Sequence, residues 1–231
     1  MRPAVLAAVA VLVLAGLLFG LISLDDLEDL FTGSSGGSMQ TGTAQTASPE
    51  EALAALEDLT VAEAGSMSGY SREAFPHWSD AGEFGWEVPS EACDARDAAL
   101  IRDGEDVAVG EGCSVTGLWR DPYSGVTNTD ASDVDIDHLV PLANAWRSGA
   151  DEWSEEKRER FANAPENLLA ADAGENRSKG DRGPEAWRPP DEGAWCDYAV
   201  RWTLVKRDYA LSVTSEERTS LREMLDTCEA A

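Results

Sequence analysis

The stretch Asp133-Val134-Asp135-Ile136-Asp137-His138-Leu139-Val140-Pro141 decides the fold of this chain. Apolar and acidic residues alternate up to His138, which predicts a β-strand over 134–138 with one face against the core. Pro141 ends the strand, because proline cannot donate to a β-ladder. Asp135 and Asp137 fall on the face opposite to the apolar residues, and we therefore expect Asp137 to lie outside the core. His138, one of only two histidines in the chain, stands at the strand end, where it can reach the same site as Asp137.

A second apolar run and a polar cluster follow this strand. Residues 167–171 (Asn-Leu-Leu-Ala-Ala) predict a short strand that pairs antiparallel with 134–138. The cluster Glu175-Asn176-Arg177-Ser178-Lys179-Gly180-Asp181 predicts a helix or tight turn that begins at Asn176 and folds over the pair. A β-hairpin followed by a helix would bring Asp137, His138 and Asn176 to one site.

The rest of the folded body is predicted to be mainly helical, so that the fold class is α+β. Ser48-Pro49 opens a helix, with serine as N-cap and proline in the first turn. Thr214-Ser215-Glu216-Glu217 is a capping box that opens another. Further helices are expected over 93–102, 142–147 and 197–209 and directly after Ser154, and a further strand over 113–119.

The net charge of −26 is unusual for a protein that touches nucleic acid, because binding to phosphates normally uses a basic surface. Acidic residues outnumber basic ones by 44 to 18. Two interpretations follow: a protein that avoids polyanions, or one adapted to high salt. We favour the halophilic interpretation, because molar salt shortens the Debye length to about 3 Å and screens distant repulsion.

Residues 3–24 form an uncharged, almost wholly apolar segment, long enough for a bilayer core that needs about 20 residues. Arg2 precedes the segment and acidic residues follow it, which places the body outside the cytoplasm. No small-x-small cleavage site comes directly afterwards, so we interpret residues 1–24 as a membrane anchor; the alternative is a cleaved signal helix and a secreted protein. Residues 25–49 are predicted to be a flexible linker and residues 50–231 the folded domain.

The four cysteines, Cys93, Cys113, Cys196 and Cys228, suit an oxidising compartment and predict structural disulfides. Four cysteines allow three pairings, of which sequence proximity favours Cys93–Cys113 with Cys196–Cys228. A zinc site is disfavoured, because no Cys-x2-Cys spacing occurs.

The residue types around His138 suit hydrolysis of a phosphodiester. This reaction uses a divalent ion to stabilise the pentavalent phosphate, and the oxygen ligands of Asp137 and Asn176 suit Mg²⁺. Histidine is the natural base near neutral pH. Arg177 and Lys179 are predicted to hold flanking phosphates of the substrate.

The ordered set Asp-x-Asp-His-x-x-Pro, Asn-Leu-Leu and Asn-Arg-Ser-Lys-Gly-Asp resembles the HNH, or ββα-metal, nuclease motif. It is similar to the domain that cuts the guide-paired strand in RNA-guided CRISPR effectors, and it more closely resembles the secreted HNH/DUF1524 family of bacteria and archaea. The similarity extends over residues 70–228 and includes Cys-Asp-Ala-Arg-Asp at 93–97 and Asp-Pro-Tyr-Ser-Gly at 121–125.

The resemblance implies a metal-dependent endonuclease with Mg²⁺ or Mn²⁺ as cofactor and DNA as substrate, with RNA left open. By position, His138 matches the general base, and Asp137 and Asn176 match the metal ligands. Asn167 matches the middle position of the motif, which braces the loop and the histidine. The membrane is a partner only through the N-terminal helix, and no protein partner is predicted.

Other polar residues leave their roles open. Arg96 and Arg72 are candidates for substrate binding or for scaffold ion pairs, and His77 is either structural or a phosphate ligand. The alternative function is a non-catalytic cell-surface binding or structural module on a nuclease-derived scaffold, which the net charge of −26 favours.

Overall fold

The antiparallel strand pair predicted around His138 is present in the computed structural model, which describes residues 48–228. β4 (Val134–His138) pairs with β5 (Leu168–Asp172) in a register that sets His138 opposite Leu168. α7 (Ala173–Lys179) follows β5 directly. It begins three residues before the predicted position, because the Asp172 carboxylate caps it by accepting from the backbone N–H groups of the first turn.

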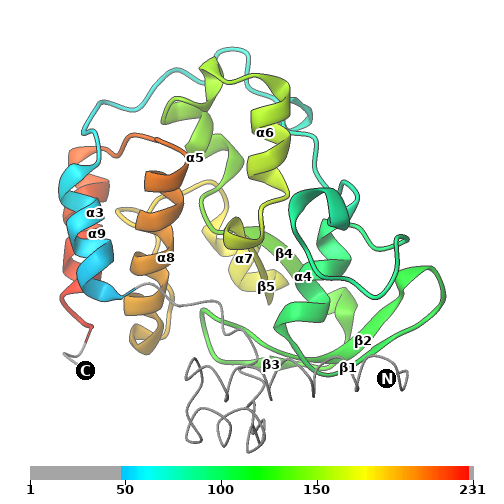
Figure 1. The fold of residues 1–231 in the computed structure, drawn as a ribbon. Coiled ribbons are helices and arrows are strands. Elements are labelled where there is room, and N and C mark those ends of the chain that lie inside the picture. The colour runs from blue at the N-terminus through cyan, green and yellow to red at the C-terminus, as the bar shows by residue number, and fades with distance from the viewer. Residues whose placement is uncertain (1–47, 229–231) are drawn as a thin grey trace, which may run out of the picture. The chain divides into compact units, whose positions relative to one another are not determined.

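The remaining elements give the mixed α and β composition that the sequence predicted (Figure 1). They are α3 (Pro49–Asp58), α4 (Ala95–Asp103), β1 (Gly104–Val109), β2 (Val115–Arg120), β3 (Thr127–Asn128), α5 (Leu142–Arg147), α6 (Glu155–Ala162), α8 (Trp195–Asp208) and α9 (Ser215–Leu225).

β5 separates two hydrophobic cores. Leu168 and Ala170 belong to a cluster formed with α4, β2 and β4, whereas Leu169 and Ala171 belong to a larger cluster formed with α3, α5, α8 and α9. Successive side chains of a strand point to opposite faces, so one short apolar run serves both cores. The β4–β5 pair is thereby fixed from two sides.

The helices α3, α8 and α9 lie side by side and cover one side of the larger core (Figure 1). The predicted caps are confirmed: Ser48 caps α3, and Thr214 and Glu217 form the capping box of α9. Between α8 and α9, the fully buried Lys206 pairs with Glu217 at 3.0 Å.

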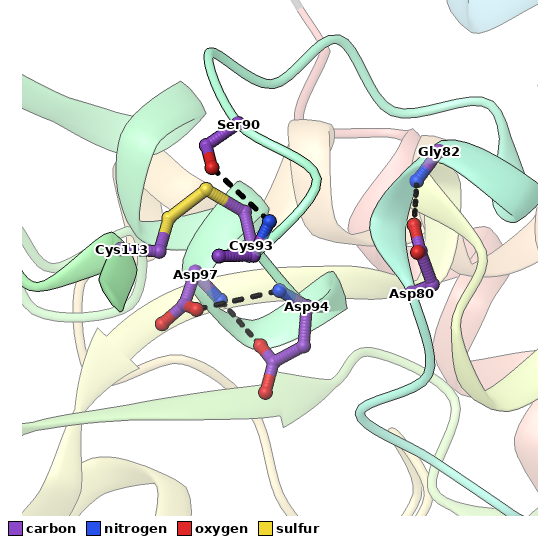
Figure 2. The surroundings of a disulfide bond; sticks show 8 residues. Asp80, Gly82, Ser90, Cys93, Asp94, Asp97 and Cys113 are labelled. Carbon is purple, nitrogen blue, oxygen red and sulfur yellow. Dashed lines mark hydrogen bonds between the residues drawn. A yellow bond between two sulfur atoms is a disulfide. The ribbon is translucent and has the colours of Figure 1, made fainter. Parts of the chain in front are cut away.

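The smaller core is covered by α4 and by the antiparallel sheet β1-β2-β3. Figure 2 shows that the Cys93–Cys113 disulfide closes at the N-terminal end of α4, beside the Asp94–Asp97 capping box. β2 agrees with the strand predicted over 113–119. β1 was not predicted, because most of its side chains are exposed and carry no clear apolar alternation. The second predicted disulfide, Cys196–Cys228, joins the start of α8 to the segment after α9.

The segments predicted as anchor (1–24) and linker (25–49) lie outside the described residues, apart from residues 48 and 49 at the start of α3. Among residues 48–228, no helix is long and apolar enough to cross a membrane.

Candidate active site

A cavity of about 310 Å³ opens where β4 ends, bounded by the start of α5, by α7 and by the segment around residue 72. Its charged, amide-bearing and imidazole-bearing lining residues are Arg72, Asp137, His138, Asn176, Arg177 and Asp181. The structure therefore brings together five residues that the sequence singled out: Arg72, Asp137, His138, Asn176 and Arg177.

His138 is held in one tautomer by the backbone. Its Nε2 lies 2.9 Å from the carbonyl oxygen of Ala162, and because a carbonyl can only accept, Nε2 carries the proton. Burial lowers the pKa of His138 to about 3, against the opposing effect of the Ala162 hydrogen bond. The imidazole is thus neutral at neutral pH, with Nδ1 unprotonated. The indole of Trp78 stacks on it at 5.8 Å between ring centroids.

Asp137 is buried, at 4% exposure, and does not lie outside the core as predicted. Lys179 Nζ donates to it at 2.9 Å, and the Tyr123 hydroxyl donates to its Oδ2 at 2.5 Å. These partners compensate the buried charge, which is why an acid is tolerated there. Burial raises the pKa of the Asp137 carboxyl, and the Lys179 ammonium opposes that rise.

The prediction that Lys179 binds substrate is wrong. Its side chain is fully buried, and its ammonium is bonded to Asp137 and to the His138 carbonyl oxygen at 2.9 Å. Lys179 cannot meet a phosphate in the cavity. It instead ties α7 to the end of β4, and so fixes the backbone that carries Asp137 and His138.

Asn176 and Arg177 are anchored by the other acid of β4. Asn176 Nδ2 donates to Asp135 Oδ2 at 3.2 Å. The other polar atom of this side chain, the carboxamide oxygen, has no hydrogen-bond partner among residues 48–228. Arg177 Nε lies 3.6 Å from the same carboxylate oxygen, and its side chain is 73% exposed. Asp135 thus orients one potential oxygen ligand and one cation at the cavity wall.

Asn167, to which the motif resemblance assigns a bracing role, is hydrogen-bonded to the loop that follows His138. It is fully buried; its Oδ1 accepts from the Val140 N–H at 2.9 Å and its Nδ2 donates to the Val140 carbonyl at 3.3 Å. The Asn167 carbonyl also accepts from the Leu139 N–H at 2.8 Å. The loop directly after His138 is therefore fixed to the start of β5.

We expect Asn167→Ala to lower the free energy of unfolding by about 2–4 kcal/mol, because two buried backbone groups of Val140 lose their partner. Urea denaturation measures the change. Asn128→Ala, which removes one half-buried side-chain hydrogen bond, is the control and should cost only about 1 kcal/mol. Equal losses in the two variants would contradict the bracing role.

Arg96 is not among the residues that line the cavity; it lies on α4. Arg72 lines the cavity instead, because the segment before α4 passes over the end of β4. Tyr123 and Trp78, which contact Asp137 and His138, were not predicted as site residues. For Tyr123 a sequence signal existed, because this residue lies in the Asp-Pro-Tyr-Ser-Gly motif at 121–125. No local pattern signals that Trp78, which has a positive φ of 62°, reaches His138.

The cavity offers oxygen donors that fit a hydrated divalent ion. No group of three or more histidine, cysteine or acidic side chains in residues 48–228 is arranged to hold a metal. Asp137 nevertheless keeps acceptor capacity beyond its two partners, because a carboxylate has about four lone-pair sites. The Asn176 oxygen has no hydrogen-bond partner within residues 48–228. Two oxygen ligands suffice for Mg²⁺, which retains several waters.

Most of the residues that line this cavity lie in a part of the chain that is similar to a nuclease family. Residues 110–224, which run from before β2 into α9, match the family model described as GmrSD restriction endonucleases, C-terminal domain. The chain is 47% identical over 184 residues to an uncharacterized secreted protein of Arthroderma benhamiae, a match that covers 78% of this chain and 86% of that protein. The chain belongs to the same family as this secreted protein. No solved structure matches this chain.

Proposed function

We propose that this protein is a metal-dependent endonuclease of the HNH, or ββα-metal, class that hydrolyses phosphodiester bonds of DNA outside the cytoplasm. The convergence of His138, Asp137 and Asn176 on one cavity, within the region that matches a nuclease family, carries the proposal. The order β4, β5, α7 agrees with the strand–strand–helix arrangement that the resemblance implies. The secreted relative supports the location, and an anchor at residues 1–24 remains part of the proposal.

His138 acts as the general base in this proposal. Its Nδ1 takes the proton of the attacking water while Nε2 stays bonded to the Ala162 carbonyl, so that the ring does not rotate. A phosphate anion in the cavity favours the imidazolium and raises the pKa of His138 from its low value. Asn167 contributes by holding the loop after His138, and Lys179 by fixing Asp137.

Asp137 and Asn176 would hold Mg²⁺ or Mn²⁺ through their side-chain oxygens. An ion held there would supply positive charge to the phosphate and to the leaving oxygen. Arg177, largely exposed at the cavity wall, is placed to meet a flanking phosphate of the substrate.

We expect Mn²⁺ to bind the purified protein and Asn176→Ala to weaken this binding by at least about 10-fold, because one of two protein ligands is lost. Isothermal titration calorimetry measures the affinity. Ser178→Ala, which changes an exposed neighbour on α7, is the control. Unchanged Mn²⁺ affinity in Asn176→Ala would exclude the proposed ligand.

The net charge of −26 favours a second candidate, a non-catalytic surface module on the same scaffold. The two differ in one outcome: a nuclease converts supercoiled plasmid to nicked and linear forms with Mg²⁺ or Mn²⁺ and stops when EDTA is added. If the protein binds neither metal nor DNA at low or at high salt, the non-catalytic surface module is the better account.

A further inference from the structure

Arg72 is held at the cavity by a neutral group. Its Nε donates to His77 Nε2 at 3.3 Å, while His77 Nδ1 lies 2.8 Å from the Phe75 carbonyl oxygen. A carbonyl only accepts and a guanidinium only donates, so His77 carries its proton on Nδ1 and is uncharged. Among residues 48–228, no carboxylate oxygen lies within 4.0 Å of the Arg72 guanidinium.

The other ionised groups at the cavity are balanced in pairs. Asp137 pairs with Lys179 at 2.9 Å, and Asp181 pairs with Arg147 at 2.7 Å. The third pair, Arg177 with Asp135, is described above. Arg72 therefore gives the cavity wall one positive charge in excess, although the chain as a whole carries −26.

We infer that Arg72, oriented by His77, is a binding residue for a backbone phosphate of the nucleic-acid substrate. A carboxylate in the place of His77 would orient the guanidinium equally well but would cancel its charge and repel the phosphate. The His77 imidazole orients the guanidinium by accepting from Arg72 Nε. The other N–H donors of the guanidinium and its full charge are left for an anion, with which a guanidinium forms strong paired hydrogen bonds.

This inference rests on the proposed function for the identity of the ligand, and it adds a residue that the matched family region does not contain. Arg72 and His77 precede residues 110–224. Arg72 lines the cavity, with His77 bonded to its Nε, because the segment before α4 folds over the end of β4. The phosphate that Arg72 binds lies beside His138 and Asn176, which line the same cavity.

The test measures binding without cleavage. A fluorescently labelled single-stranded oligonucleotide is titrated with the full chain in EDTA at low salt, and its anisotropy is recorded. We expect Arg72→Ala to weaken binding by about 10-fold or more, because a charged hydrogen-bonding group is lost. His77→Glu should weaken it comparably although Arg72 is present, whereas His77→Gln, which keeps a neutral acceptor, should stay within about 3-fold of the unaltered protein.

Arg160→Ala is the matched control. Arg160 is an exposed cation on α6 that does not line the cavity, so its loss changes the net charge equally and should alter the affinity by less than about 2-fold. An oligonucleotide with an uncharged methylphosphonate backbone should bind Arg72→Ala and the unaltered protein alike. Circular dichroism confirms that each variant is folded.

Three results would overturn the inference: no binding by the unaltered protein, unchanged binding by Arg72→Ala, or equal binding by His77→Glu and His77→Gln. None of them depends on catalysis. A protein that binds as described in EDTA but does not cleave DNA with Mg²⁺ would sink the proposed nuclease activity and leave the phosphate site standing.

Discussion

Replacement of His138 by alanine is expected to lower the rate of DNA cleavage by about 10²–10⁴-fold, the usual contribution of a general base. The reason is the fixed tautomer: Nε2 is occupied by the Ala162 carbonyl, so Nδ1 is the ring nitrogen left to accept a proton in a residue that lines the cavity. Single-turnover cleavage of a duplex oligonucleotide with Mg²⁺ measures the effect. The buried Ala162 carbonyl that is left without its hydrogen bond should cost about 1–3 kcal/mol of stability.

A second substitution separates catalysis from scaffolding. His138→Gln retains an N–H donor for the Ala162 carbonyl but has no group that accepts a proton in the required range. If His138 is the base, the His138→Gln variant cleaves DNA as slowly as the His138→Ala variant. Cleavage by His138→Gln at a rate near that of the unaltered protein would show that His138 only supports the loop.

Replacement of Lys179 by methionine is expected to lower the free energy of unfolding by about 3–5 kcal/mol, because Asp137 is left as an unpaired charge in the interior. The loss should be partly reversed by Mn²⁺, since a cation bound at Asp137 compensates the same charge and ligand binding stabilises the folded state. Thermal denaturation with and without Mn²⁺ measures both effects.

The molecule contains its own control for this experiment. Lys206 is equally buried and pairs with Glu217 at 3.0 Å, but neither residue lines the cavity. The Lys206→Met variant should therefore be destabilised to a similar extent. Mn²⁺ should raise its stability no more than it raises that of the unaltered protein. Equal Mn²⁺ responses of the two methionine variants would contradict a metal site at Asp137.

The features that could be predicted from the sequence are those that local patterns encode. Alternation over 134–138 and the apolar run after Asn167 specify two strands that pair, and capping residues mark the helix starts at Ser48, Ser154 and Thr214. The disulfides followed from closeness in sequence.

The features that could not be predicted depend on which side chains meet in space. Strand periodicity places Asp137 away from the apolar face of β4, but it does not reveal that a second core covers that side as well. The ammonium that makes burial possible comes from Lys179, on α7. The sequence left the roles of Arg72 and His77 open, because their segment has no regular period, and only tertiary contacts bring Arg72 to the cavity.

The most direct test of the proposed metal-dependent nuclease is the conversion of supercoiled plasmid by the purified protein, with His138→Ala beside it. Because the net charge of −26 opposes approach to DNA at ordinary ionic strength, the assay is run at low and at high salt. We predict nicked and linear products with Mg²⁺ or Mn²⁺, none with EDTA, and a strongly reduced rate for the folded His138→Ala variant. Equal cleavage by the two proteins, or no cleavage by the unaltered protein in any of these conditions, would contradict it.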